Sequence, residues 1–195
     1  MASSSAYILN VDNKRTGKSE KFGLRLFSPA TDLEPLAQLQ TSTEEALASL
    51  KKTITKGYRR FPWGFFVVED SKRCLAGTVQ LGFFRPWWFT MAMGRQPFPV
   101  PFTISKILVA LGILDDFEIS NIFICPEYRG TGLADELMEF AEKFARELWK
   151  RKKIILLVNA ENKPALKLYE KRGFHVKGVF RKGAIEKLEM AKPLI

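Results

Sequence analysis

A short glycine-rich stretch, from Arg129 to Ala134, holds the residue types best suited to bind an anion. Gly130 and Gly132 stand beside the fixed positive charge of Arg129, and apolar residues at steps of three and four then predict a helix to Leu148. The first N–H groups of a helix have no partner inside it, and the helix dipole is positive there. A phosphate can dock on these donors where glycines let the backbone come close. The stretch therefore predicts a phosphate site, although a glycine-rich turn alone is a weak signal.

Two segments carry a resemblance to a known family. Arg129-x-x-Gly132-x-Ala134 resembles the Q/R-x-x-G-x-G/A motif of the GNAT superfamily of N-acetyltransferases, and Asn162-x-x-Ala165-x-x-Leu168-Tyr169-Glu170-x-x-Gly173-Phe174 resembles its second signature. The resemblance implies an α/β fold: a mixed, mostly antiparallel central sheet flanked by helices, with splayed central strands that form a cofactor cleft. It implies acetyl-coenzyme A as co-substrate and no metal. The cofactor contacts that it implies are Ile122, Phe123, Ile124, Arg129, Gly130, Thr131, Gly132, Leu133, Ala134 and Asn162.

Glu118 is the carboxylate that we predict to be the general base. It lies eleven positions before Arg129, and strand residues at this offset supply the base in several enzymes of the resembled family. An alkylamine, with a pKa of about 10.4, must lose a proton before it can attack a thioester. A carboxylate in a partly buried cleft can have its pKa raised toward the working range. The alternative is a structural acid bonded to a neighbouring strand or basic residue.

Tyr169 is the predicted general acid. In the resembled family, the tyrosine at this place in the second signature often lies near the sulfur and returns a proton to the departing thiolate. A thiol pKa of about 8.5 makes the thiolate a fair leaving group already, so Tyr169 assists rather than enables the reaction. The alternative is a core tyrosine whose hydroxyl is hydrogen-bonded within the protein.

The rest of the chain predicts the elements that position these residues. We expect a first hairpin, two helices with a capping box at Ser42-x-x-Glu45 before the second, and a hairpin of two further strands. A strand then leads into the glycine turn, a buried parallel strand follows the long helix, and Asn162 caps a helix that ends before Gly173. The predicted strands are Ala6–Val11, Phe22–Phe27, Gly64–Asp70, Leu75–Phe84, Phe117–Ile124, Lys153–Val158, Phe174–Phe180 and Gly183–Met190, and the first two helices are Leu33–Leu39 and Thr43–Lys56.

The length of 195 residues fits a single domain, residues 1–195. Residues 1–21 form an N-terminal extension or an extra strand. Residues 85–114 depart from the compact family pattern as an insertion rich in aromatic residues and proline. The insertion could pack on the core, cover the acceptor pocket, form a homodimer interface or present an amphipathic surface patch.

Charge and composition limit the classes of partner that the chain could bind. The net charge is +10, with basic runs that could be solvated surface, could steer a phosphate-bearing cofactor, or could bind nucleic acid or an acidic membrane. We expect no nucleic-acid partner, because no recognised nucleic-acid module is present and aromatic residues are not interleaved with the basic runs. No basic and apolar leader opens the chain, and no apolar run reaches the length of a membrane span, so we expect a cytoplasmic protein. His175, the only histidine, is expected at a surface or edge position, and Cys74 and Cys125 as two buried thiols.

The sequence thus favours an enzyme that moves an acetyl group from acetyl-coenzyme A to a primary amine of a small molecule or peptide by direct attack. The other reading is a non-catalytic module of the same fold that binds coenzyme A or an anionic partner. Variable loops bind the acceptor in such enzymes, so the sequence leaves its identity open.

Overall fold

One eight-stranded sheet organises the part of the chain that the structure describes. The structure is a computed structural model, and it describes residues 7–83, 107, 117–182 and 185–194. The strand order is β1-β2-β3-β4-β5-β6-β8-β7, and only the β5–β6 pair is parallel among these neighbours. The strands are β1 Tyr7–Asp12, β2 Ser19–Leu26, β3 Phe65–Glu69, β4 Leu75–Phe83, β5 Phe117–Ile124, β6 Lys153–Asn159, β7 His175–Lys182 and β8 Ile185–Pro193.

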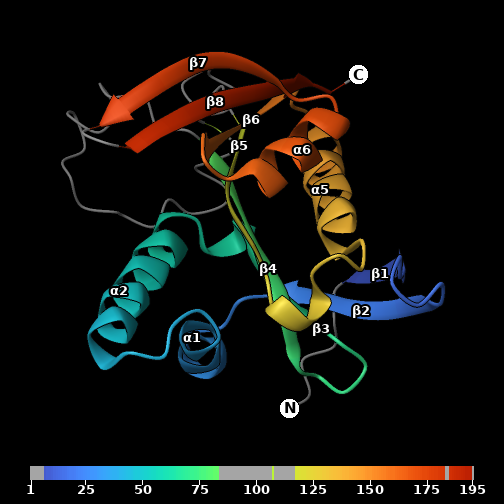
Figure 1. The fold of residues 1–195 in the computed structure, drawn as a ribbon, viewed down its shortest axis with the longest axis vertical. Helices are drawn as coiled ribbons and strands as arrows, with labels where there is room; N and C mark the ends of the chain where they lie inside the picture. Colours follow the sequence, from blue (N-terminus) through green and yellow to red (C-terminus); the bar gives the residue numbers. More distant parts are fainter. Residues whose placement is uncertain (1–6, 84–106, 108–116, 183–184, 195) are drawn as a thin grey trace.

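Helices cover both faces of this sheet (Figure 1). α1 (Pro29–Gln38) and α2 (Glu44–Arg60) pack on one face, in a cluster that includes Phe65 and Val67 of β3. α5 (Leu133–Lys143) packs on the other face against residues such as Phe117 and Ile119 of β5. α6 (Lys163–Lys171) lies beside α5 in Figure 1, and its partly buried residues join the same cluster. The expected α/β fold with a mixed, mostly antiparallel sheet is confirmed.

β5 and β6 are paired over only a short length. Phe117, Glu118 and Ile119 pair with Ile154, Ile155 and Leu156. Beyond that point β5 continues along β4 as far as Ile124, and β6 continues along β8 as far as Asn159. The two central strands therefore separate toward their carboxyl ends, which is the splayed geometry that the family resemblance implied.

A β-bulge at Ser120 marks the start of this separation. Gln80 of β4 lies opposite Asn121 and the next residue, Leu81, lies opposite Ile119, so Ser120 is the extra residue. Its hydroxyl donates to the carbonyl oxygen of Gln80 at 3.2 Å. The bulge resets the alternation of side chains between Glu118 and the last residues of β5.

The segments around the motifs follow the sequence closely. α5 begins directly after Gly132 and passes into a π-helical segment, Phe144–Leu148. Asn162 caps α6 by accepting from the N–H of Ala165 at 3.3 Å. Gly173 ends that helix with a φ of +84°, and the N–H of Phe174 reaches the carbonyl of Tyr169 at 3.0 Å, as in a Schellman motif.

Some details differ from the expectations. α2 begins after Thr43 without a side-chain cap, so the capping box at Ser42 is wrong, and the helix runs on to Arg60. Short 3₁₀ turns, Pro62–Gly64 and Pro126–Tyr128, precede β3 and the glycine turn. Cys125 is buried as expected, but Cys74 is exposed because it follows the tight β3–β4 turn.

Several expectations fall on residues outside the described part of the chain. The insertion 85–114 lies there except for Ile107, which is helical and exposed. Gly183, the predicted start of the last strand, also lies there. His175 is exposed at the start of the edge strand β7, as predicted. Among the described helices, none is both long enough and apolar enough to cross a membrane.

Candidate active site

A cavity of about 680 Å³ brings the two motif segments together. It is bounded by the end of β5, by the glycine turn that opens α5 and by the first turns of α6. The predicted contact residues that line it are Ile122, Phe123, Ile124, Arg129, Gly130, Gly132, Ala134 and Asn162, and Tyr169 lines it as well. Segments that are separated by a whole strand and helix in the sequence thus form one concave surface.

The glycine turn has backbone geometry that an ordinary side chain would oppose. Gly130 has a φ of +76° and Gly132 a φ of +104°, both in the left-handed region where a Cβ atom is strained. Among the described residues, no acceptor within the protein is found for the N–H groups of Gly130, Gly132 or Ala134. These donors lie at the amino end of α5, so the turn is suited to hold a phosphate group.

Thr131 and Leu133 do not line the cavity. Thr131 is buried, and its hydroxyl donates to the carbonyl of Tyr128 at 2.7 Å while it accepts from the N–H of Leu133 at 3.3 Å. Leu133 is fully buried in the core under α5. These two side chains fix the shape of the turn from beneath it, whereas their neighbours face the cavity.

Arg129 closes the turn against the end of β5. Its Nε donates to the carbonyl oxygen of Ile124 at 3.2 Å, which fixes the plane of the guanidinium group. The side chain lies on the cavity wall and the residue is exposed. The terminal nitrogens can therefore offer a planar pair of donors to an anion.

Tyr128 ties the same turn to the β3–β4 connection. Its hydroxyl donates to Asp70 at 2.8 Å, and the other oxygen of Asp70 accepts from the N–H groups of Lys72 and Cys74. Burial, followed by the hydrogen bond to the carboxylate, raises the pKa of Tyr128 well above its ordinary value. Tyr128 thus stays protonated and holds the residue before Arg129 in place.

Tyr169 lies on the α6 side of the cavity. Burial raises the pKa of its hydroxyl above the ordinary value. The group is therefore a protonated donor at neutral pH, which is the state that a general acid needs.

Glu118 does not line this cavity. Phe117 and Ile119 point into the cluster under α5, so Glu118 between them points to the opposite face of the sheet. There it is 8% exposed and borders a small hollow with Phe61 and Gly82. It lies one residue before the point at which β5 and β6 separate, so it stands near the closed end of the opening between the strands.

Cys125 is an unsuitable nucleophile despite its place between β5 and the glycine turn. Burial, and then the charge of Glu127, raise the pKa of its thiol to about 11. The sulfur donates to the carbonyl oxygen of Leu75 at 3.2 Å. It is a buried structural thiol, in agreement with the sequence interpretation.

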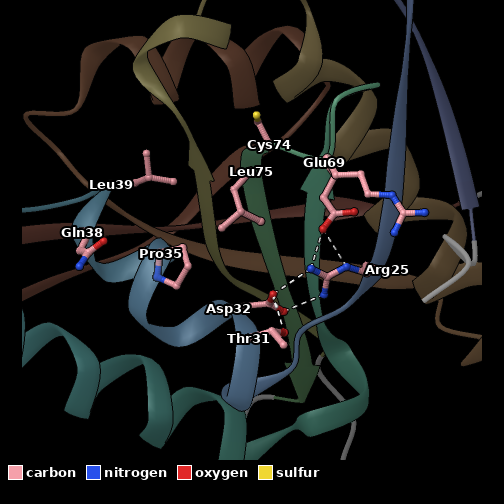
Figure 2. Close-up of a pocket in the computed structure, with 10 residues that line it drawn as sticks. Arg25, Thr31, Asp32, Pro35, Gln38, Leu39, Glu69, Cys74 and Leu75 are labelled. Atoms are coloured by element: carbon pink, nitrogen blue, oxygen red, sulfur yellow. Dashed lines mark hydrogen bonds and ion pairs between the residues drawn. The ribbon is translucent and has the colours of Figure 1, made fainter. Parts of the chain in front are cut away.

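A second hollow, of about 590 Å³, lies between α1 and the β3–β4 turn (Figure 2). Arg25 occupies its wall and donates two bonds to Asp32, at 2.7 and 2.8 Å, and two to Glu69, at 3.0 and 2.6 Å. Asp32 also accepts from the backbone N–H of Ser28, so its carboxylate holds the start of α1. These charges bind one another and anchor α1 to the sheet, so we interpret the network as structural.

Sequence reasoning missed several residues on the wall of the motif cavity. Pro164, Ala165 and Leu168 lie within the second signature, but they are not among the predicted cofactor contacts. Tyr128 and Asp135 flank the first motif, and adjacency was the only signal for them. Lys14 comes from the loop between β1 and β2, and its place in a basic run was the only hint.

Side chains of the kinds that bind metals are not grouped in the described part of the chain. No set of three or more histidine, cysteine, aspartate or glutamate side chains there could hold a metal ion.

Comparisons with known proteins agree with this geometry. A spermidine N(1)-acetyltransferase of Escherichia coli K12 is 39% identical over 58 residues, which are 30% of this chain and 31% of that protein. The catalytic subunit of the N-terminal acetyltransferase B complex of Arabidopsis thaliana is 35% identical over 79 residues, 39% of this chain and 45% of that protein. The chain thus matches less than half the length of these curated relatives.

Solved structures and a family model extend the match over most of the chain. A dodecameric spermidine N-acetyltransferase of Vibrio cholerae superposes with a TM-score of 0.57 at 23% identity, over 89% of this chain and 94% of the other, which shows a shared fold. The model of the acetyltransferase (GNAT) family matches residues 33–174, which include both motif segments and β6 between them. The chain therefore belongs to the GNAT acetyltransferase family.

Proposed function

We propose that this protein transfers an acetyl group from acetyl-coenzyme A to a primary amine of a small molecule or peptide. The observation that carries the proposal is the single cavity built jointly by the glycine turn and the start of α6. Its charge, its backbone donors and its length along β5 suit a ligand with a diphosphate at one end and a slender arm. The names of the matched relatives, which include N-acetyltransferases of spermidine and of protein N-termini, favour an amine acceptor.

The diphosphate of the donor is assigned to the turn. The N–H groups of Gly130, Gly132 and Ala134 lie at the amino end of α5, where the helix dipole is positive, and Arg129 adds a guanidinium group. The pantetheine arm then follows Ile122, Phe123 and Ile124. Beyond Ile119 these residues have β4 as their only strand partner among the described strands, so their other edge can pair with the amides of the arm.

The thioester is assigned to the point where β5 and β6 separate. Backbone N–H groups on the open edge of β5 polarise its carbonyl oxygen, which takes up negative charge as the amine attacks. Glu118 removes a proton from the amine, directly or through a water molecule, so that the nitrogen lone pair can form the new C–N bond. The C–S bond then breaks, and Tyr169 donates its proton to the thiolate. The nitrogen of the new amide loses its second proton through solvent, which restores the neutral tyrosine.

The donor and the acceptor would bind on opposite faces of the sheet. The donor binds on the side of α5 and α6, whereas Glu118 points toward Phe61 at the end of α2. The acceptor amine would therefore approach from the side of α2 and meet the thioester through the gap between the strands. This division gives a carboxylate access to the amine without placing it against the phosphates.

An acceptor screen tests the proposal. The purified protein is offered acetyl-coenzyme A together with polyamines, amino-terminal peptides and other primary amines, and release of free thiol is followed. We expect thiol release that depends on one class of amine, with an acetylated product of matching mass. Coenzyme A binding without thiol release with any amine would instead identify a non-catalytic binding module.

A further inference from the structure

The loop between β1 and β2 touches the glycine turn directly. The backbone N–H of Lys14 donates to the carbonyl of Thr131 at 3.0 Å, and the guanidinium of Arg15 donates to the carbonyl of Glu127 at 3.0 Å. These contacts hold the loop at both ends of the segment that contains Arg129 and Gly130. The N-terminal hairpin is thus part of the wall around the phosphate turn.

The loop itself has a defined shape. Asn13 is buried, and its side-chain oxygen accepts from the N–H groups of Arg15 at 2.9 Å and Thr16 at 3.3 Å. The side-chain nitrogen of Asn13 donates to Glu20 at 2.6 Å, across the base of the loop. This Asx-type turn fixes the position from which Lys14 projects.

Lys14 lies over Gly132 and reaches the cavity. A Cβ atom added at Gly132 would lie 3.5 Å from Cε and 3.8 Å from Cδ of Lys14. The lysine is one of the residues that line the cavity, together with Arg129, Gly130 and Ala134. Its ammonium group therefore stands at the same end of the cavity as the backbone donors of the turn.

The present partner of Lys14 is easily exchanged. Its Nζ pairs with Asp135 in the first turn of α5, and the hydrogen bond to this carboxylate raises the pKa of the lysine, so it is charged. The side chain of Lys14 is 55% exposed, and an ion pair in water contributes little to stability. The diphosphate, with one negative charge on each phosphorus, or the doubly charged 3′-phosphate of coenzyme A would be a stronger partner than one carboxylate.

We propose that Lys14 is a cofactor-binding residue, which moves from Asp135 to a phosphate group of coenzyme A and thereby extends the phosphate site onto the N-terminal hairpin. The inference rests on the proposed function, since it assumes that the cavity holds coenzyme A. The phosphate can be the diphosphate or the 3′-phosphate of the ligand, because both present anionic phosphoryl oxygens to the ammonium group.

Calorimetric titration with Lys14→Met tests the inference. Methionine keeps the alkyl stem over Gly132 and removes the charge, and the backbone bond to Thr131 does not depend on the side chain. Lys18→Met is the matched control, because Lys18 is an exposed lysine of the same loop that does not line the cavity. We expect Lys14→Met to weaken coenzyme A binding about tenfold, Lys14→Arg to restore most of the loss, and Lys18→Met to stay within about twofold of wild type.

Titration of the same variants with dephospho-coenzyme A locates the contact. A loss confined to coenzyme A assigns Lys14 to the 3′-phosphate, and an equal loss with both ligands assigns it to the diphosphate. If Lys14→Met binds each ligand as tightly as the wild type does, the inference is overturned and the proposed function stays intact. A wild-type protein that binds neither ligand overturns both.

Discussion

Glu118 on β5 lies directly opposite Gly82 on β4. Glu118, Gly82 and Phe61 line one small hollow, and the missing side chain at position 82 leaves the space for it. A Cβ atom at Gly82 would lie 3.2 Å from Cγ of Phe61, so the ring already occupies the nearest space. Glu118 is thus a buried acid whose immediate surroundings include a glycine and an aromatic ring.

Replacement of Glu118 by glutamine should remove the base without changing the shape of the strand. We expect kcat/KM to fall by about a hundredfold at neutral pH, within the range usual for loss of general base catalysis. The deficit should shrink at high pH, where more of the amine is already unprotonated. The measurement is the pH–rate profile of acetyl transfer.

The matched control for this variant is Glu44→Gln, which neutralises an exposed carboxylate at the far end of α2. Coenzyme A affinity should be nearly unchanged in both variants, because neither residue lines the motif cavity. A Glu118→Gln profile that parallels the wild type at every pH would remove Glu118 from the base role.

Tyr169→Phe should slow thiolate protonation and leave the fold intact. The raised pKa of this tyrosine keeps it protonated at neutral pH, so the wild type has a donor that phenylalanine lacks. The thiolate is a fair leaving group without help, so we expect a loss of about tenfold in kcat. Steady-state kinetics with saturating acetyl-coenzyme A provide the measurement.

Tyr58→Phe is the control for that substitution, since Tyr58 projects from α2 and packs against Phe27, away from the motif cavity. It should keep the wild-type kcat. If Tyr169→Phe also keeps it, the hydroxyl of Tyr169 has no part in proton transfer.

Gly132→Ala should weaken coenzyme A binding as well as stability. A φ of +104° strains any residue with a Cβ atom, at a cost of about 1–2 kcal/mol. The new methyl group would make only ordinary contacts, 3.5 Å from Cε of Lys14 and from the carbonyl oxygen of Asp12, so the strain comes from the backbone. Urea unfolding and calorimetric titration report the two effects separately.

Gly173→Ala supplies the comparison. Gly173 has a φ of +84° and only one ordinary contact, 3.9 Å from Lys192, so it carries similar strain at the far end of α6. Both variants should lose similar stability, but only Gly132→Ala should lose affinity for coenzyme A. Equal affinities for the two variants would show that the turn does not hold the ligand.

The Arg25–Asp32–Glu69 network predicts how stability depends on pH. Burial alone would raise the pKa of Asp32, but hydrogen bonds from Arg25, Ser28 and Thr31 together hold it below its ordinary value. The stabilisation is therefore complete above the unfolded-state pKa, about 3.9, and it is lost as the pH falls through the lower folded-state pKa. The wild type should lose stability steeply below about pH 4.

Asp32→Asn tests this assignment by urea unfolding from pH 2 to pH 7. Removal of one partner from a buried ion pair should cost about 3 kcal/mol at neutral pH, because the side chain of Asp32 is only 3% exposed. The difference from wild type should narrow as the pH falls below 4. A difference that stays constant down to pH 2 would contradict the role given to the ionised carboxylate.

Local patterns predicted the elements around the motifs well. Gly132 before an apolar helix, and Asn162 and Gly173 at the two ends of α6, were placed correctly because capping depends on near neighbours. The capping box at Ser42 is wrong, since Thr43 begins α2 without a side-chain bond. Short polar runs offer several starting points for a helix, and tertiary packing chooses among them.

Long-range relationships were not available from local patterns. The bulge at Ser120 depends on how β5 meets β4, and the contact of Lys14 with Thr131 joins segments more than a hundred positions apart in the chain. The family resemblance implied the splayed strands, but residue spacing alone did not. The exposure of Cys74 was missed because the residue type alone does not show whether a cysteine is buried.

Hydrogen–deuterium exchange with and without coenzyme A maps the bound ligand onto the backbone. Coenzyme A should slow exchange in three segments that surround the motif cavity: residues 122–124, residues 130–134 and residues 162–169. Exchange of the residues that line the hollow between α1 and the β3–β4 turn should be unchanged. Protection confined to that hollow, or absent from the glycine turn at saturating ligand, would contradict the assignment of the cleft.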